Sequence, residues 1–123
     1  MSLLLDTHVL IWWDEGRRIT AGARRAIEEA DAVYVSAASA WEVAINTALG
    51  RLRATRTVEQ AVSESGFEEL PVTFRHAERL LALPPHHRDP FDRMLVAQAE
   101  VEQLTLVTRD PVFSRYAVDL IQA

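Results

Sequence analysis

The sequence predicts an α/β fold with a central, mostly parallel sheet of about five strands flanked by helices. Short apolar runs alternate with helical stretches along the chain, as in folds whose strands are joined by helical crossovers. Of the 123 residues, 49% are hydrophobic, which is enough for one real core. We therefore expect residues 1–123 to form a single domain.

Apolar runs, capping residues and helix breakers place the elements along the chain. Leu3 to Leu5 is an all-leucine run, typical of a buried strand in a parallel sheet. Gly50 stands at the C′ position that is expected to close the helix before it, and Pro90 occupies the favoured first position of a helix. We expect further strands at Val33–Val35, Glu69–Val72, Thr105–Thr108 and Val118–Ile121, and helices at Thr7–Trp13, Thr20–Ala30, Ser36–Leu49, Thr57–Ser65, Thr73–Leu83 and Asp89–Gln103.

The composition excludes several classes of protein. Without cysteine, the chain has no disulfide, no catalytic thiolate and no Cys-ligated zinc. A formal net charge of -5 argues against a protein that coats duplex DNA, and every basic residue is an arginine. No apolar run approaches the ~20 residues of a membrane span, and Asp6 ends the first leucine run with no basic segment before it. We expect a cytoplasmic protein.

Four acidic residues lie near the points where strands end. Asp6 follows the first strand directly, and Glu42 lies in the first two turns of the helix after the second strand. Asp92 lies in the first turn of the last predicted helix, and Asp110 lies two residues past the fourth strand. Ligands of open parallel sheets bind in the crevice beyond the C-terminal ends of the strands. We therefore expect the four carboxylates to converge on one point.

Clustered carboxylates imply a divalent cation. Each like charge raises the pKa of its neighbours, and a bound cation removes that penalty. Oxygen ligands select hard ions, so Mg²⁺ or Mn²⁺ is expected rather than Zn²⁺. Such an ion can activate a water to attack a phosphodiester and can stabilise the leaving oxygen. The pattern therefore indicates hydrolysis of RNA or DNA.

Each acid also has a structural interpretation, because helix caps and turns favour the same residue types. Asp89 is assigned mainly to capping, with a supporting role near the metal as the alternative. The motifs that fit a cap, a capping box or a turn are Asp6, Ser39 to Glu42, Asp89 to Asp92 and Asp110-Pro111. Taken singly these interpretations stay open, whereas four such placements together favour a site.

Four segments resemble the motifs of a known family. In chain order they are Leu3-Leu4-Leu5-Asp6-Thr7-His8-Val9-Leu10-Ile11-Trp12, Ser36 to Ile45 with Trp41-Glu42-Val43 inside it, His87 to Ala99, and Leu106-Val107-Thr108-Arg109-Asp110. These segments resemble PIN-domain ribonucleases, and most closely the VapC toxins of bacterial toxin–antitoxin modules. The order of the motifs and the length of the chain also suit that family.

The resemblance implies a PIN-like three-layer domain with Mg²⁺- or Mn²⁺-dependent endoribonuclease activity. It further implies an RNA substrate, a cognate antitoxin as protein partner and a homodimer. Matched motif by motif, the catalytic and metal-binding acids are Asp6, Glu42, Asp92 and Asp110, with Asp110 the more variable. Residues expected to support the carboxylates or contact substrate are Thr108, Asp89, Arg93 and His8.

Some residues depart from the family pattern or have a structural interpretation. His8 stands where many members have asparagine, and Asn46 stands where many relatives in this branch have lysine. His86 and His87 are interpreted as loop residues, because adjacent histidines do not face one metal as a helical i, i+4 pair does. Arginines beside the acids are candidates for phosphate contacts and, equally, for intrachain pairing with those acids.

Three other functions compete with this hypothesis. A response-regulator-like phosphoacceptor module shares the size and the acid cluster, but it needs a lysine, and this chain has none. A non-catalytic PIN-like interaction protein has no need of the four acids. A deoxyribonuclease uses the same site chemistry, so the choice of RNA as substrate rests on the resemblance.

Overall fold

The computed structural model describes all 123 residues and is built around a five-stranded sheet in which every pairing is parallel. The predicted α/β class and the five-stranded parallel sheet are both confirmed. Strand β1 lies at the centre of the sheet, hydrogen-bonded to β2 on one side and β4 on the other. The strands, in their order across the sheet, are β3 (Glu68–Leu70), β2 (Ala32–Ser36), β1 (Ser2–Leu5), β4 (Thr105–Thr108) and β5 (Leu120–Gln122).

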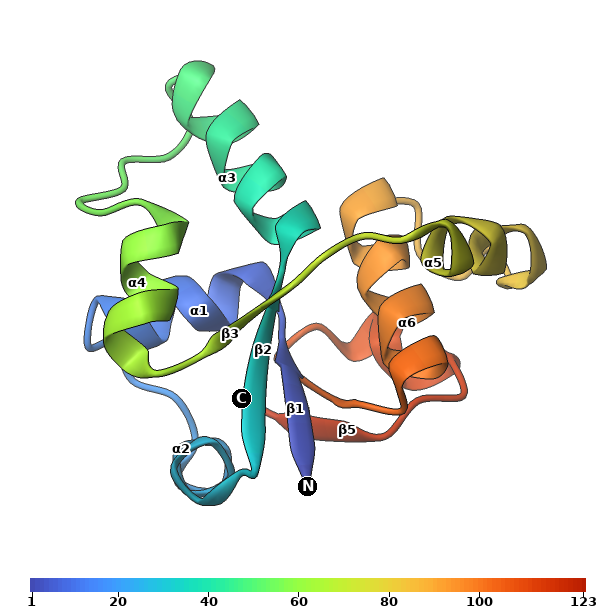
Figure 1. The fold of residues 1–123 in the computed structure, drawn as a ribbon, viewed down its shortest axis with the longest axis horizontal. Helices are drawn as coiled ribbons and strands as arrows, with labels where there is room; N and C mark the ends of the chain where they lie inside the picture. The colour runs from blue at the N-terminus through green and yellow to red at the C-terminus, as the bar shows by residue number, and fades with distance from the viewer.

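Helices cover both faces of the sheet and give the molecule three layers. Helices α1, α2 and α4 lie on one side of the sheet and α5 and α6 on the other, while α3 extends from the end of β2 (Figure 1). None of them has the length and apolar character needed to cross a membrane. The helices are α1 (Thr7–Asp14), α2 (Ala21–Glu29), α3 (Ala37–Ala48), α4 (Val58–Ser65), α5 (Phe74–Arg79) and α6 (Pro90–Glu102), with 3₁₀ turns η1 (Leu80–Ala82) and η2 (Pro111–Arg115).

The leucines of β1 join the two halves of the core. Because side chains alternate along a strand, Leu3 and Leu5 pack into the cluster under α1, α2 and α4, whereas Leu4 packs into the cluster under α6. All three are fully buried. Each full burial contributes on the order of 2 kcal/mol. The strand that carries Asp6 at its end is therefore the most firmly held segment of the sheet.

The strands that follow β1 and β4 along the chain lie on opposite sides of this central pair. From β1 it proceeds outward to β2 and β3, then returns through α5 and α6 to β4 on the other side of β1, and ends in β5. The crevice beyond the C-terminal ends of β1 and β4 is therefore a topological switch point. The backbone N–H of Asp6 donates to the carbonyl of Val107 (3.0 Å), so the two strand ends are held side by side.

Three predicted elements have boundaries that were wrong by two residues or more. The fifth strand covers Leu120–Gln122 rather than Val118–Ile121. The third strand covers Glu68–Leu70 rather than Glu69–Val72, because Pro71 has no N–H with which to continue the ladder. The helix predicted to reach Leu83 ends at Arg79 and tightens into the 3₁₀ turn η1. Such a turn is common at helix C-termini.

Candidate active site

Asp6 is a buried carboxylate at the C-terminal end of the central strand. Its residue is 6% exposed and occupies the N-cap position of α1, but its side chain accepts no capping hydrogen bond. Instead, the hydroxyl of Thr108 donates to Asp6 Oδ2 (2.8 Å), while Oδ1 is buried without any partner. The structural interpretation of Asp6 as a side-chain cap is therefore wrong, and one of its oxygens is free for a ligand.

Glu42 comes to the same crevice from α3. The capping box predicted for Ser39 and Glu42 was wrong, because Ser36 is the N-cap and its hydroxyl accepts from the N–H of Ala38 (3.0 Å). Ser39 lies inside the helix, where its hydroxyl accepts from that of Thr7 (2.8 Å) and links α3 to α1. Glu42 is thus free of a capping role, and its Oε1 is buried without a partner.

Asp92 projects from the first turn of α6, whose start is fixed by Asp89. The Oδ1 atom of Asp89 accepts from the N–H groups of Phe91 (2.8 Å) and Asp92 (3.3 Å), so the predicted capping role of Asp89 is confirmed. Pro90 follows as the first helical residue. These contacts fix the direction in which Asp92 leaves the helix, and its side chain is 16% exposed.

Asp110 lies on the opposite side of the crevice, after β4. Its N–H donates to the hydroxyl of Thr108 (3.1 Å), the same hydroxyl that donates to Asp6. Its Oδ1 accepts from the N–H of Val112 (2.9 Å), which caps η2. Thr108 therefore connects the carboxylate of Asp6 with the backbone of Asp110, so the residue expected to support the carboxylates contacts one of them directly.

The pKa values indicate that the carboxylates lie close together. Burial raises the pKa of both Asp6 and Glu42. Asp110 behaves differently: burial pushes its pKa upward, but hydrogen bonds from Val112 and His87 outweigh it and leave the pKa lowered. The pKa of Asp92 rises to about 8, owing first to burial and then to the charges of Asp6, Asp89, Glu42 and Asp110.

His87 is a member of this cluster that the sequence interpretation missed. It was interpreted as a loop residue, and it does lie in the loop before α6, but its Nε2 atom is 3.0 Å from Asp92 Oδ2 and 2.9 Å from Asp110 Oδ2. The signal available in the sequence was its position two residues before Asp89, at the start of the third motif. Its neighbour His86 is exposed and packs on the ring of Tyr116.

The other residues expected near the acids are only partly where they were predicted. His8 lies close enough for a charge on its ring to lower the pKa of Asp6, and it lines a pocket with Glu42. The guanidinium of Arg93 instead donates to the carbonyls of Pro84 (3.0 Å) and Leu80 (3.4 Å). The expected role of Arg93 at the site was therefore wrong, because backbone carbonyls beside η1 bind its donors.

The guanidinium of Arg109 also binds groups outside the acid cluster, although the residue lies between Thr108 and Asp110 in the sequence. Its guanidinium lies over the ring of Trp12, 4.1 Å from the ring centroid, and donates to the carbonyls of Arg18 and Ala123. This arrangement stabilises the contact between α1 and the end of the chain. Arg109 is therefore held within the chain, but by backbone carbonyls and an aromatic ring rather than by the nearby acids with which pairing was expected as the alternative.

The donor set fits a hard divalent cation. Two buried oxygens without partners, one on Asp6 and one on Glu42, are each costly unless something binds them. Burial and the charges of the neighbouring acids raise the pKa of Asp92 to about 8, a cost that a bound cation would remove. Oxygen donors of this kind are the preferred ligands of Mg²⁺ and Mn²⁺.

The raised pKa of Asp92 makes the stability of the metal-free protein depend on pH. Between the ordinary aspartate pKa of 3.8 and the raised pKa of about 8, the folded protein keeps a proton on Asp92 that the unfolded chain releases, so stability falls as pH rises through this window. We expect Asp92→Asn to raise the free energy of unfolding by about 1–2 kcal/mol at pH 8 and by almost nothing at pH 4. Urea unfolding in EDTA measures both values.

Asp119→Asn is the matched control, because Asp119 is exposed and lies outside the cluster. It should leave the pH dependence of unfolding as in the wild type. A destabilising effect of Asp92→Asn at pH 8 would contradict the buried like-charge description of this residue.

Comparisons with known proteins identify the family of this chain. The model of the family described as "PIN domain" matches residues 3–119. Ribonuclease VapC22 of Mycobacterium tuberculosis is 34% identical over 118 residues, which cover 89% of this chain and 87% of that protein.

Solved structures of lower identity share the fold. VapBC2 from Rickettsia felis, bound to a DNA fragment of its promoter, superposes with a TM-score of 0.71 at 15% identity and covers 99% of this chain and 98% of that one. A toxin–antitoxin complex from Klebsiella pneumoniae superposes with a TM-score of 0.68 at 23% identity, covering 98% and 96%. With a family model matched along nearly its whole length, the chain belongs to the PIN domain family.

Proposed function

We propose that this protein is a Mg²⁺- or Mn²⁺-dependent endoribonuclease and the toxin of a toxin–antitoxin pair. The proposal depends on one observation: the side chains of Asp6, Glu42, Asp92 and Asp110 lie close together in the crevice beyond the strand ends. Two of these acids have a buried oxygen without a partner. The choice of RNA is supported by the 34% identity to a protein named a ribonuclease.

Each acid has a distinct part in this proposal. Asp6 and Asp92 are the direct metal ligands, because they are the two most buried carboxylates of the cluster. Glu42 orients the attacking water, and Asp110 completes the negative site from the side of β4. When bound, the metal ion lowers the pKa of water and stabilises negative charge on the phosphate oxygens. Thr108 keeps Asp6 in place through its 2.8 Å hydrogen bond.

Metal binding in this site is coupled to proton release. Ligands bind a cation in their deprotonated form, so the affinity of the site for metal rises as Asp92 loses its proton. Because the pKa of Asp92 is about 8 without metal, most of this change falls between neutral and alkaline pH.

The loss of either direct ligand should abolish cleavage. We expect Asp6→Ala and Asp92→Ala each to lower the rate on single-stranded RNA by at least about 100-fold in Mg²⁺ while circular dichroism stays as in the wild type. EDTA should stop the wild-type enzyme, and added Mn²⁺ should restore it. The readout is 5′-end mapping of the products of a defined RNA, with a DNA of the same sequence beside it.

Asp119→Ala is the control here, because it removes an exposed carboxylate at a distance from the crevice. Wild-type rates in Asp6→Ala or Asp92→Ala would overturn the assignment of that residue. Metal binding without any cleavage would favour the non-catalytic interaction protein, and preferential cleavage of DNA would favour the deoxyribonuclease.

The substrate phosphate has a candidate contact beside Glu42. A pocket of about 280 Å³ opens between α1, α3 and the segment after α3, lined by His8, Glu42, Asn46 and Arg51 among others. Arg51 is exposed and forms no ion pair, so its guanidinium is free to bind a phosphate. Arg51 lines the same pocket as Asn46, the residue that stands where many relatives have lysine.

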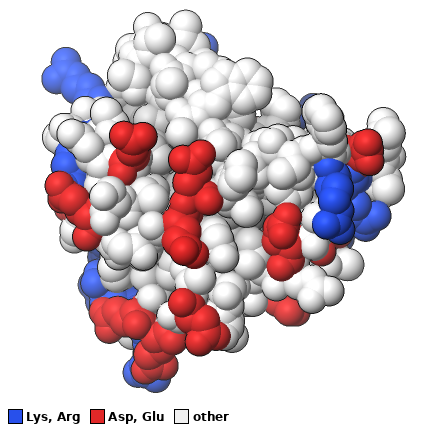
Figure 2. Space-filling view, viewed as in Figure 1, with Lys and Arg blue, Asp and Glu red and all other residues white.

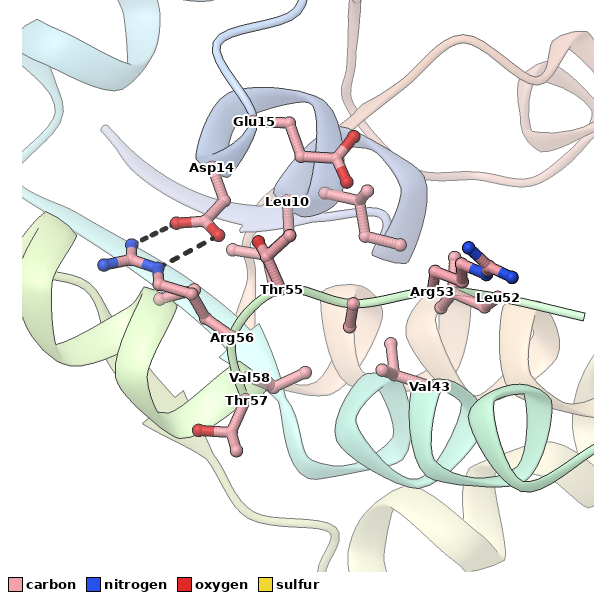
Figure 3. A pocket seen from close by; sticks show the side chains of 13 residues that line it. Leu10, Asp14, Glu15, Val43, Leu52, Arg53, Thr55, Arg56, Thr57 and Val58 are labelled. Carbon is pink, nitrogen blue, oxygen red and sulfur yellow. Dashed lines mark hydrogen bonds and ion pairs between the residues drawn. The ribbon is translucent and has the colours of Figure 1, made fainter. Parts of the chain in front are cut away.

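The chain segment that carries Arg51 is anchored at its other end. Arg56 pairs with Asp14 of α1 and with Glu64 of α4, and apolar side chains line the space between this segment and the two helices α1 and α3 (Figure 3). Figure 2 shows acidic side chains across much of one face of the molecule, with arginines toward its borders. The face seen in this view has no continuous basic surface.

Arg51→Ala should weaken substrate binding more than it slows the reaction. Loss of one phosphate contact predicts a KM raised by roughly 10-fold, a kcat within about 3-fold of the wild type and a salt slope of binding reduced by about one. Arg51→Lys should keep much of the affinity. Arg53→Ala is the control, because Arg53 lies outside this pocket. Equal effects of Arg51→Ala and Arg53→Ala would contradict the assignment.

We also propose a cognate antitoxin and a homodimer as partners. The structural neighbour from Klebsiella pneumoniae is named a toxin–antitoxin complex, which supports the antitoxin. Large apolar side chains remain exposed on α3, α5 and η1, namely Trp41 (64%), Phe74 (88%) and Leu81 (91%), which supports self-association.

Light scattering tests the dimer. A homodimer should give twice the chain mass of 13.8 kDa, and Trp41→Glu should shift it toward the monomer. Co-purification with the product of a small adjacent gene tests the antitoxin. A wild-type monomer at high micromolar concentration would overturn the dimer and leave the nuclease proposal standing.

A further inference from the structure

His87 bridges two acids that come from different parts of the chain. Its Nε2 atom is 3.0 Å from Asp92 Oδ2 on α6 and 2.9 Å from Asp110 Oδ2 before η2. The side chain is 14% exposed, so water competes little for these contacts. No other side chain forms a hydrogen bond or ion pair with both carboxylates.

The proton on the His87 ring can be located from its other nitrogen. The backbone N–H of Asp89 donates to Nδ1 at 3.2 Å, so Nδ1 is an acceptor and carries no proton in the neutral ring. A neutral imidazole has one protonated nitrogen, and the proton must therefore be on Nε2. The Nε2–H group faces the two carboxylates as a donor.

The position of the ring is fixed by contacts on its other sides. The backbone N–H of His87 donates to the hydroxyl of Tyr116 (2.8 Å), and the ring packs against Phe113 with centroids 5.4 Å apart. Phe113 is fully buried in the core under α6. The donor is therefore supported by the core of the protein rather than by a flexible loop.

We propose that His87 is a positioning residue, which donates through Nε2 to Asp110, lies 3.0 Å from Asp92 through the same atom, and holds these two carboxylates in the geometry that the cation requires. The inference rests on the proposed function in one respect, namely that the two carboxylates serve a metal site. It adds a residue to the site and gives it a defined tautomer. Outer hydrogen bonds of this kind orient metal-binding carboxylates and influence affinity.

The competing assignment makes His87 itself a metal ligand. One ligand atom from each of His87, Asp92 and Asp110 lies within 4.8 Å of the others, so distance alone permits it. Ligation through Nε2 needs a lone pair on that atom, which places the proton on Nδ1. That proton would then point at the N–H of Asp89, and two donors would oppose each other at 3.2 Å. The geometry therefore favours the donor over the ligand.

NMR of the metal-free protein tests the tautomer without any activity measurement. In protein labelled with ¹⁵N-histidine, we expect the neutral His87 ring to show the pattern of a proton on Nε2. A proton on Nδ1 would overturn the proposal. In the Mn²⁺-loaded protein, pulsed EPR should show no directly coordinated histidine nitrogen, and a strong ¹⁴N coupling that disappears in His87→Ala would overturn it as well.

Variants test the consequence for metal affinity. We expect His87→Ala to weaken Mn²⁺ binding by about 10- to 100-fold in calorimetry, and His87→Gln, which keeps an N–H donor, to recover part of the loss. His86→Ala is the matched control and should bind as the wild type, because its ring contacts Tyr116 and not the carboxylates. Equal Mn²⁺ affinity in folded His87→Ala and His86→Ala would contradict the proposal.

These measurements separate the failure of the inference from the failure of the proposed function. If the wild type bound Mn²⁺ but cleaved no RNA, the nuclease proposal would fail while the His87 results still decided its role. If His87→Ala did not fold, the ring tautomer in the wild type would decide instead.

Discussion

Crowding of like charges at the end of the central sheet is the constraint that shapes this molecule. Asp6, Glu42, Asp92 and Asp110 come from four segments and are held so close that the pKa of Asp92 reaches about 8. Such a cluster costs folding free energy when it is empty of cations. The surrounding fold offsets that cost through the fully buried leucines of β1, the Asp89 cap of α6 and the hydroxyl of Thr108.

Much of this architecture could be predicted from local patterns. The all-leucine run at Leu3 to Leu5 and the cap and proline at Asp89 and Pro90 are short-range signals, and the structure has a strand and a helix start at these places. The convergence of the acids also followed from one rule about parallel sheets. It did not require knowledge of any side-chain contact, because strand ends of a parallel sheet share one edge.

What could not be predicted depends on contacts between distant residues. Ser36 rather than Ser39 caps α3, and Ser39 instead accepts a hydrogen bond from the hydroxyl of Thr7, which lies 32 residues away. Arg93 and Arg109 looked available beside the acids, but backbone carbonyls bind their guanidinium groups. His87 looked like one of two loop histidines, and only the tertiary structure distinguishes it from His86. Spacing along a sequence carries no information of this kind.

The pairing of β1 with β4 also determines when the site comes into existence. Asp6 is translated well before its hydrogen-bond partner Thr108, which lies 102 residues further along the chain. A nascent polypeptide therefore carries Asp6 and Glu42 long before Thr108 and Asp110 have been translated. The crevice is complete only when synthesis has passed β4, so unfinished chains that are still being translated lack one wall of it.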